Sequence, residues 1–457
     1  MKHLFLLIIV VCLTFATNAA PPGQATERIA LDQFGYLPEM NKVAVLGSPQ
    51  TGFNAPDSYA PGAKFEVRKW GSNDLVFTGN VTAWNGGATH VQSGDKVWWF
   101  DFSVVTCPGS YYVYDPANDR RSYVFEIGIN AYKEVLKHAT RMFFYQRCGV
   151  PRQTPYADSK WTDVACHLRT NQDIKCRLIS ATTDAGTEKD LSGGWHDAGD
   201  HNKYVNFTTG TLSDFMFAYQ NNPTIWTDDF GIPESGNGTP DILDELKVEL
   251  DWLLKMQNSD GSVLSKVSVT QFQSASPPSA DAAARYYGAA STSSTLSAAM
   301  SFAHAAPLFS QFNSTYSTTL KNAAIKAWTW ANANPSVIFT NAGFQSANSE
   351  TDDYGRSMYK LMAAIYLYNA TQDQTYKTYA EANYSNAQPL KWTYWYPYEG
   401  TVQDALLFLT TLPNVSTSVS STIRTTHHIT VRRPFRRSQR IIKISPVTKP
   451  AVIHFVR

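Results

Sequence analysis

The 457-residue sequence is poor in charge, and no apolar run in it approaches the roughly 20 residues that cross a bilayer. Charged residues make up 17% of the chain, against roughly 25% in an average globular protein. Hydrophobic residues make up 43%, which excludes wholesale disorder. A formal net charge of only +1 argues against a general nucleic-acid binder. The short apolar runs argue against a membrane protein, and we expect a monomer.

Acidic residues are absent after Asp404. Nine of the 39 Lys and Arg residues lie beyond that position, which leaves 30 basic against 38 acidic residues before it. The balance of +1 therefore combines an acidic body of net charge −8 with a basic, atypical tail over residues 411–457. The tail shows no helical period and is centred on Arg-Arg-Pro-Phe-Arg-Arg at 432–437.

Cysteine is scarce, with five residues in the chain. One of them, Cys12, lies in residues 1–20, where a Lys, an apolar run over 4–15 and small residues indicate a signal peptide cleaved after Ala19 or Ala20. We therefore predict a secreted, extracellular protein, which seven N-x-S/T sequons also favour. Secretion makes disulfides the default for the four remaining cysteines: Cys107, Cys148, Cys166 and Cys176.

Hydrophobic periodicity divides the rest of the chain. Residues 27–127 hold short β-rich runs separated by turn residues, which indicates an immunoglobulin-like β-sandwich. From 131 to 410 the period becomes helical without comparable strands, so this part is predicted to be all-α. The clearest helices are predicted at 241–257, 293–308, 317–333 and 357–370. Thr239 is the expected N-cap of the first of these helices, and Pro240 its first residue.

The most informative segment is GGWHDAGDHNKY at residues 193–204. Asp197 and Asp200 stand three residues apart, and Gly199 between them lets the backbone bend so that both carboxylates can face one point. Two such carboxylates can orient a water molecule and take its proton, as the base side of an inverting glycosidase does. The alternative is a turn whose aspartates are merely solvated.

In these motifs the sequence resembles glycoside hydrolase family 9, the cellulases with an (α/α)6 barrel. Residues 193–204 are similar to the family's G-G-[YW]-x-D-A-G-D-x-x-K-[YF] segment, and IPESGNGTPDILDE at 232–245 is a second match. Residues 32–38 and 108–112 resemble the immunoglobulin-like module that precedes the barrel in one branch. The resemblance implies an endoglucanase that hydrolyses β-1,4 bonds of cellulose or related β-glucans with inversion. Asp200 would be its base, and Asp197 would position the water.

One part of the family pattern is missing. The family's general acid is a Glu in an Asn-Glu segment near the end of the barrel, and this sequence has no glutamate after Glu399. Because 131–410 is also short for twelve helices, we expect an incomplete barrel, its end replaced by the tail through a frameshift, a mis-called intron or a sequencing error. Two alternatives stay open: a basic arm for anionic polysaccharide or nucleic acid, and a non-catalytic glucan-binding relative without the acid.

The resemblance also implies metal sites. Cys148, Cys166, His167 and His196 resemble the ligands of a structural zinc, for which two thiolates and two imidazoles form a closed tetrahedral set. The competing prediction is a Cys148–Cys166 or Cys166–Cys176 disulfide, and Cys107 is expected to be an unpaired, buried strand residue. Calcium is a weaker prediction, because its four oxygen ligands can equally form an acidic first helical turn: Glu234, Asp241, Asp244 and Glu245.

Aromatic residues are dense between 392 and 398. A flat sugar face packs well on an aromatic ring, so this stretch could supply platforms for glucose units. Trp395 is the preferred candidate for substrate binding. Barrel core is the alternative for each member of the set: Trp392, Tyr394, Trp395, Tyr396 and Tyr398.

Overall fold

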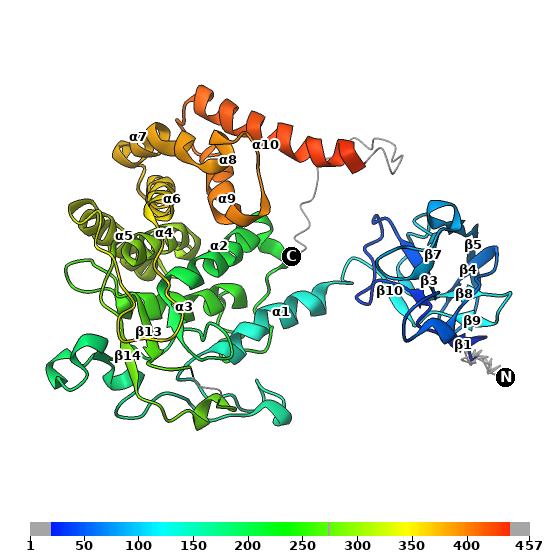
Figure 1. Cartoon of the computed structure of the whole chain (residues 1–457), viewed down its shortest axis with the longest axis horizontal. Coiled ribbons are helices and arrows are strands. Elements are labelled where there is room, and N and C mark those ends of the chain that lie inside the picture. Colours follow the sequence, from blue (N-terminus) through cyan, green and yellow to red (C-terminus); the bar gives the residue numbers. More distant parts are fainter. Residues whose placement is uncertain (1–19, 273–274, 439–457) are drawn as a thin grey trace, which may run out of the picture. The chain divides into compact units, whose positions relative to one another are not determined.

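The computed structural model describes residues 20–272 and 275–438 (Figure 1). The predicted signal peptide, apart from Ala20, and the last part of the basic tail lie outside these residues. Among the described helices, none combines the length and the hydropathy needed to cross a membrane. The chain forms two compact units, Met1–Ala139 and Thr140–Arg457, and each is considered by itself.

The N-terminal unit is the predicted β-sandwich. One sheet has the strand order β1-β9-β8-β4-β5 with β10 paired to β8, and the other has the order β2-β3-β7-β6. The strands are β1 Gln24–Ala25, β2 Ile29–Ala30, β3 Val43–Pro49, β4 Lys64–Lys69, β5 Leu75–Asn80, β6 Thr82–Ala83, β7 Asp95–Asp101, β8 Gly109–Asp115, β9 Arg120–Arg121 and β10 Phe125–Ile127.

The core of the sandwich follows the two-residue period of its strands, because successive side chains point to opposite faces of a sheet. Alternate residues of β3, β4 and β8 and the end of β7 turn inward and form one buried cluster. Its members include Ala44, Leu46, Phe65, Val67, Phe100, Phe102, Tyr111 and Val113.

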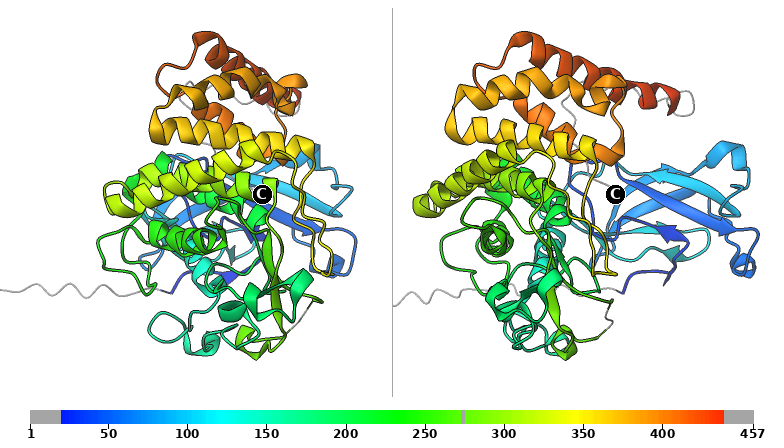
Figure 2. Two further views of the ribbon diagram at one scale, coloured as in Figure 1. Left: turned by 90° about the vertical axis from the view of Figure 1, so that its left-hand side faces the viewer. Right: turned by 60° about the vertical axis from the view of Figure 1, so that its left-hand side comes forward.

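The C-terminal unit is mainly helical. Its helices are α1 Lys133–Gln146, which begins in the N-terminal unit, α2 Val205–Asn221, α3 Asp241–Met256, α4 Thr292–Phe309, α5 Ser314–Ala333, α6 Asp353–Thr371, α7 Gln374–Asn383, α8 Gln388–Lys391, α9 Gly400–Leu409 and α10 Thr417–Ser438. Helix α4 has no charged residue and is buried on all sides, as expected of a central helix. It packs against α2, α5 and α6 (Figure 2).

The four helices predicted most clearly from periodicity are confirmed as α3 to α6, with ends shifted by at most a few residues. The predicted cap of α3 is wrong. The helix begins at Asp241, Pro240 occupies the cap position, and no side chain caps the first turn.

A small sheet departs from the all-α prediction. Strands β11 Arg177–Leu178, β12 Lys203–Tyr204, β13 Lys266–Val269 and β14 Arg285–Tyr287 pair in the order β11-β14-β13-β12. Strands of two to four residues are too short to show a two-residue period in the sequence. The sheet matters for the site because β12 connects the turn that carries Asp197 and Asp200 directly to α2.

The start of the basic tail is also more regular than predicted. Residues 417–438 form helix α10, which packs against α8 and α9. Val419 and Ile423, one turn apart, are buried. The expectation of no helical structure is therefore wrong for this part of the tail, and the remainder lies outside the described residues.

Candidate active site and metal centre

Asp197 and Asp200 lie on one tight turn at the start of β12. The Asp197 backbone N–H donates to the carbonyl of Asn202 at 2.8 Å, which closes the turn. Asp200 Oδ2 accepts from Asn202 Nδ2 at 2.8 Å and from the Tyr204 hydroxyl at 3.3 Å, and Oδ1 accepts from the Asn202 N–H at 3.3 Å. Three donors thus fix the Asp200 carboxylate, whereas Asp197 lies exposed on the surface.

The two carboxylates interact electrostatically. Although Asp197 is exposed as a residue, partial desolvation of its carboxyl group raises its pKa, and the charge of Asp200 raises it further. A pair of this kind has one fixed acceptor and one neighbour that holds a proton more readily than a free aspartate does. It can therefore bind a water molecule and receive its proton.

A cavity of about 250 Å³ lies beside Asp197. Its aromatic lining suits the flat face of a sugar ring. Glu249 adds a buried carboxyl group, and burial raises the pKa of that group to about 7. The aromatic residues of the lining are Phe143, Trp195, Tyr204 and Phe207.

The structure brings together the four predicted zinc ligands, Cys148, Cys166, His167 and His196. All are buried, and their ligand atoms lie within 4.8 Å of one another. His167 Nδ1 is 3.2 Å from His196 Nε2 and 3.5 Å from Cys148 Sγ, and Cys166 Sγ is 3.8 Å from His196 Nε2.

These separations fit a tetrahedral zinc. Bond lengths of about 2.05 Å to nitrogen and about 2.3 Å to sulfur would place the two nitrogens about 3.3 Å apart, and a nitrogen and a sulfur about 3.6 Å apart. The pKa shifts of the four groups differ in direction. A hydrogen bond from Cys148 lowers the pKa of Cys166 to about 6, and burial lowers the pKa of His196, whereas burial raises the pKa of the Cys148 thiol.

Neither predicted disulfide forms. Cys148, Cys166 and Cys176 are buried free thiols. Cys107 is unpaired, as predicted. The predicted burial in a strand is wrong, because this thiol is exposed and lies in the bend before β8.

Helix α3 holds two of the segments that carry the predicted zinc ligands. Glu245 Oε2 accepts from Arg147 Nη2 at 2.8 Å, and Glu245 Oε1 accepts from Trp195 Nε1 at 2.8 Å. One turn later, Glu249 Oε2 accepts from the Trp195 N–H at 2.6 Å. Arg147 and Trp195 immediately precede the ligands Cys148 and His196, so two buried glutamates of one helix fix both segments.

A second buried network was missed by the sequence analysis. Asp173 accepts from Lys203 Nζ at 2.7 Å, from Arg285 Nε at 2.5 Å and from Cys148 Sγ at 3.3 Å. Arg285 in turn donates to the carbonyl of His201 at 2.9 Å. No local pattern marks these residues, because each contact spans at least 25 positions in sequence.

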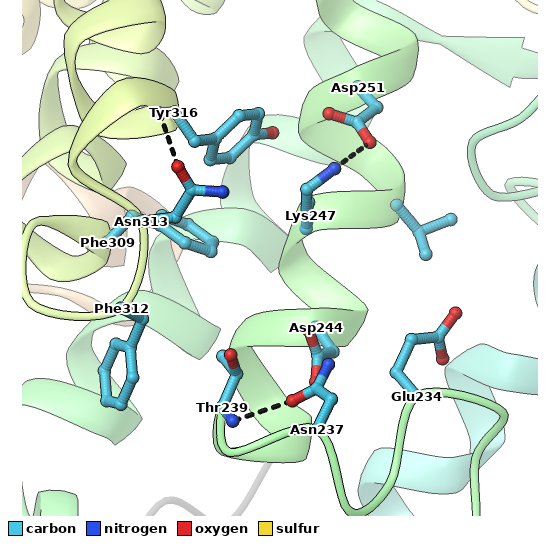
Figure 3. A pocket seen from close by; sticks show the side chains of 11 residues that line it. Glu234, Asn237, Thr239, Asp244, Lys247, Asp251, Phe309, Phe312, Asn313 and Tyr316 are labelled. Atoms are coloured by element: carbon cyan, nitrogen blue, oxygen red, sulfur yellow. Dashed lines mark hydrogen bonds and ion pairs between the residues drawn. The ribbon is translucent and has the colours of Figure 1, made fainter.

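The predicted calcium ligands divide into two groups. Glu234 and Glu245 both form ion pairs with Arg147, and Arg147 Nη2 lies 3.0 Å from Glu234 Oε2. The charges of these two glutamates are therefore already compensated. Asp241 and Asp244 instead approach Asp228, with ligand atoms within 4.8 Å of one another. Figure 3 shows Glu234 and Asp244 at a cavity of about 340 Å³ near the start of α3. The set of four is therefore wrong as a single site, and calcium itself stays a prediction.

The structure does not place Trp395 on an open surface. Its side chain is 8% exposed, and its ring packs edge-on against His427 with centroids 4.8 Å apart. The exposed members of the aromatic stretch are Trp392, Tyr394 and Tyr398. Stacking of a sugar on Trp395 is therefore disfavoured.

Comparison with protein families matches both units. A model described as glycosyl hydrolase family 9 matches residues 132–441. The chain belongs to glycosyl hydrolase family 9. A second model, the cellulase N-terminal Ig-like domain, matches residues 24–118, in agreement with the sandwich.

Curated relatives include endoglucanase D of Acetivibrio thermocellus, 30% identical over 361 residues, which cover 77% of this chain and 53% of that protein. A xyloglucan-specific endo-beta-1,4-glucanase of Bacteroides ovatus is 29% identical over 80% of this chain and 61% of its own length. The chain thus spans between half and two thirds of the length of these relatives.

Solved structures agree with the fold. A metagenome-derived family 9 endoglucanase superposes with a TM-score of 0.74 at 28% identity, covering 90% of this chain and 73% of that one. A Zn-binding triple mutant of the family 9 endoglucanase J30 superposes with a TM-score of 0.69 at 29% identity, covering 86% and 70%. The (α/α)6-barrel fold class with a preceding β-sandwich is therefore confirmed.

Proposed function

We propose that this chain is a secreted endoglucanase that hydrolyses β-1,4-glucans with inversion at the anomeric carbon. The observation that carries the proposal is the pair of carboxylates on one closed turn, of which Asp197 lines an aromatic cavity. Asp200, fixed by Asn202 and Tyr204, accepts the proton of a water molecule that Asp197 helps to orient. The water oxygen then attacks the anomeric carbon from the face opposite the leaving sugar, the glycosidic C–O bond breaks, and the leaving oxygen takes its electron pair and receives a proton from a separate acid or from solvent.

The exposed aromatics support a glucan at the same end of the barrel. Asn206, in the first turn of α2, donates to the carbonyl of Ser349, which precedes α6. Tyr354, in the first turn of α6, donates to Glu399, which precedes α9. The loop that carries Trp392 and Tyr398 therefore lies near the helix ends that follow the catalytic segment, where glucose units can stack on it.

A second candidate is glucan binding without turnover. An inverting reaction also needs a carboxylic acid, about 6.5–9.5 Å from the base, that protonates the leaving oxygen. The sequence contains no glutamate after Glu399, and that residue accepts a hydrogen bond from Tyr354 at 3.0 Å. A protein with the base, the aromatic surface and no acid would bind glucan without measurable turnover.

We also propose that Cys148, Cys166, His167 and His196 hold a structural zinc. The donor set and its separations support a closed site without an open position for substrate. The ion would cross-link the segment after α1, the loop at 166–167 and the segment that leads into Asp197. Its role would be to hold these segments together, and the hydrolysis would be carried out by the carboxylates.

The test uses the full chain with carboxymethyl cellulose, xyloglucan and mixed-linkage glucan as substrates. We expect reducing-sugar release together with a fall in viscosity, and we expect Asp200→Asn to lower the rate by about 10²–10⁴-fold while binding to insoluble cellulose persists. Asp190→Asn is the matched control, because Asp190 is an exposed aspartate on the same segment that bonds Ser192 and Lys255.

Three results separate the candidates. Turnover that Asp200→Asn abolishes supports the hydrolase. Binding without turnover in the unaltered chain supports the non-catalytic candidate. Turnover that Asp200→Asn leaves unchanged shows that Asp200 is not the base.

A further inference from the structure

A buried carboxylate lies between the metal centre and the catalytic turn. Asp281 is 2% exposed and sits on the loop that leads into β14. It forms a close group with His167, a predicted metal ligand, and His201, the residue after Asp200; their side-chain ligand atoms lie within 4.8 Å of one another. Neither the motif at 193–204 nor the zinc ligand set includes Asp281.

On the metal side, Asp281 fixes the orientation of the His167 ring. His167 Nδ1 faces Cys148 and His196, whereas Nε2 faces Asp281 Oδ2 at 3.4 Å. A carboxylate on the far nitrogen keeps the proton there, so that the near nitrogen presents its lone pair to a metal. Metal-binding histidines commonly have such a partner.

On the catalytic side, Asp281 faces His201. This residue has a φ of 57°, in the left-handed region that is strained for a residue with a side chain. The surrounding contacts must compensate this strain. His201 Nδ1 lies 3.9 Å from Asp281 Oδ2, and the His201 carbonyl accepts from Arg285 Nη1 at 2.9 Å.

Asp281 is itself held rigidly. Its Oδ1 accepts from the Ala283 N–H at 2.9 Å, and its carbonyl accepts from Gln172 Nε2 at 2.9 Å and from Arg169 Nη1 at 3.2 Å. A fixed carboxylate that contacts two neighbouring elements can transmit a displacement of one to the other. A displacement of His167 would therefore displace His201, the residue that follows Asp200.

We propose that Asp281 is a positioning residue that couples the metal centre to the catalytic turn. It orients His167 for the metal and holds His201 in the left-handed conformation that presents Asp200. The inference rests on the zinc proposal above, but not on turnover, because its effects are measured on metal binding and on the backbone of residues 197–206.

The first test measures metal affinity. Zn²⁺ is titrated against a chromogenic chelator with the full chain and with Asp281→Asn, which keeps the shape of the side chain and removes its charge. We expect the affinity to fall by about 10–100-fold. In the Co²⁺-substituted protein we also expect the visible bands to shift in the variant, which a loss of general stability would not cause.

The second test measures hydrogen exchange of residues 197–206. Coupling predicts faster exchange when wild-type protein is stripped of metal, and similarly fast exchange in Asp281→Asn at saturating Zn²⁺. Asp115→Asn is the control: Asp115 is a fully buried carboxylate of the N-terminal sandwich, and its loss should change neither zinc affinity nor exchange in this segment.

The outcomes are distinct. If wild-type protein binds no Zn²⁺, both the zinc proposal and the coupling are overturned. If wild-type protein binds Zn²⁺ and Asp281→Asn binds it equally well, the coupling alone is overturned. A weaker affinity with unchanged exchange at 197–206 also overturns it, because Asp281 would then serve the metal only.

Discussion

Gly194 tests how tightly the segment that carries Asp197 and Asp200 packs against α3. It lies two residues before His196 with a φ of +74°, and its carbonyl accepts from the Cys148 N–H at 2.7 Å. A Cβ added to Gly194 would lie 2.7 Å from Trp252 Cγ and 2.9 Å from Glu249 Oε2. Both neighbours belong to α3, so the segment packs closely against that helix at Gly194.

The cost of Gly194→Ala has two parts. The positive φ costs alanine about 1–2 kcal/mol. Overpacking against a buried tryptophan adds about 1–3 kcal/mol. We therefore expect Gly194→Ala to lower the free energy of unfolding by about 2–5 kcal/mol.

The neighbouring glycine separates the two parts. Gly193 has a φ of +96°, but an added Cβ would meet no atom within 4 Å, so Gly193→Ala should cost only about 1–2 kcal/mol. The assay is urea unfolding of both variants, followed by tryptophan fluorescence. Equal unfolding midpoints for the two variants would refute the contact between Gly194 and α3.

Three further predictions follow from the same geometry. Arg147→Met should destabilise the C-terminal unit by about 3–5 kcal/mol in denaturant unfolding, because Glu245 is left buried and unpaired, and adding Glu245→Gln should recover part of the loss. Burial, and then neighbouring carboxylates, raise the pKa of Asp244 from 3.8 to about 7. The stabilisation from its protonated form is therefore complete below pH 3.8 and is lost as the pH rises through 7. Asp244→Asn should accordingly unfold at higher urea than wild type at pH 8 but not at pH 4. Replacing Trp392 and Tyr398 together by alanine should weaken cellulose binding by about 1–3 kcal/mol in a depletion assay, whereas Trp395→Ala should act on stability.

Local periodicity explains why so much of the fold could be predicted. The inward residues of β3 and β4, such as Leu46 and Phe65, alternate in sequence as they do in the sheet. The apolar stripe of α3 repeats with the helical period, so its existence was clear while its cap was not. Helix α10 could not be predicted in the same way, because it buries Val419 and Ile423 in a stretch that consists otherwise mainly of Ser, Thr and basic residues.

The residues of the candidate site also differ in whether the sequence could predict that they lie close together. Asp197 and Asp200 are separated by two residues, so their proximity follows from the sequence. Asp281 is 114 residues from His167, and no local pattern could show that they meet. Burial of Trp395 was equally hidden, because an aromatic residue in a dense stretch suits a core and a sugar platform alike.

The buried pairs of α3 lead to a last prediction, about what metal removal does. In small zinc domains the ion supplies the folding energy, so stripping it unfolds the chain. Here Glu245 and Glu249 hold Arg147 and Trp195 by direct hydrogen bonds, independently of any ion. We therefore expect the chelated protein to keep its helical circular dichroism and a cooperative unfolding transition at lower urea, while exchange at 197–206 accelerates. Adding a chelator to the Arg147→Met variant should remove the metal and the Arg147–Glu245 pair together. We expect this to abolish the cooperative unfolding transition of the C-terminal unit. A chelated wild-type protein that unfolds outright would show that α3 cannot hold these segments without the metal.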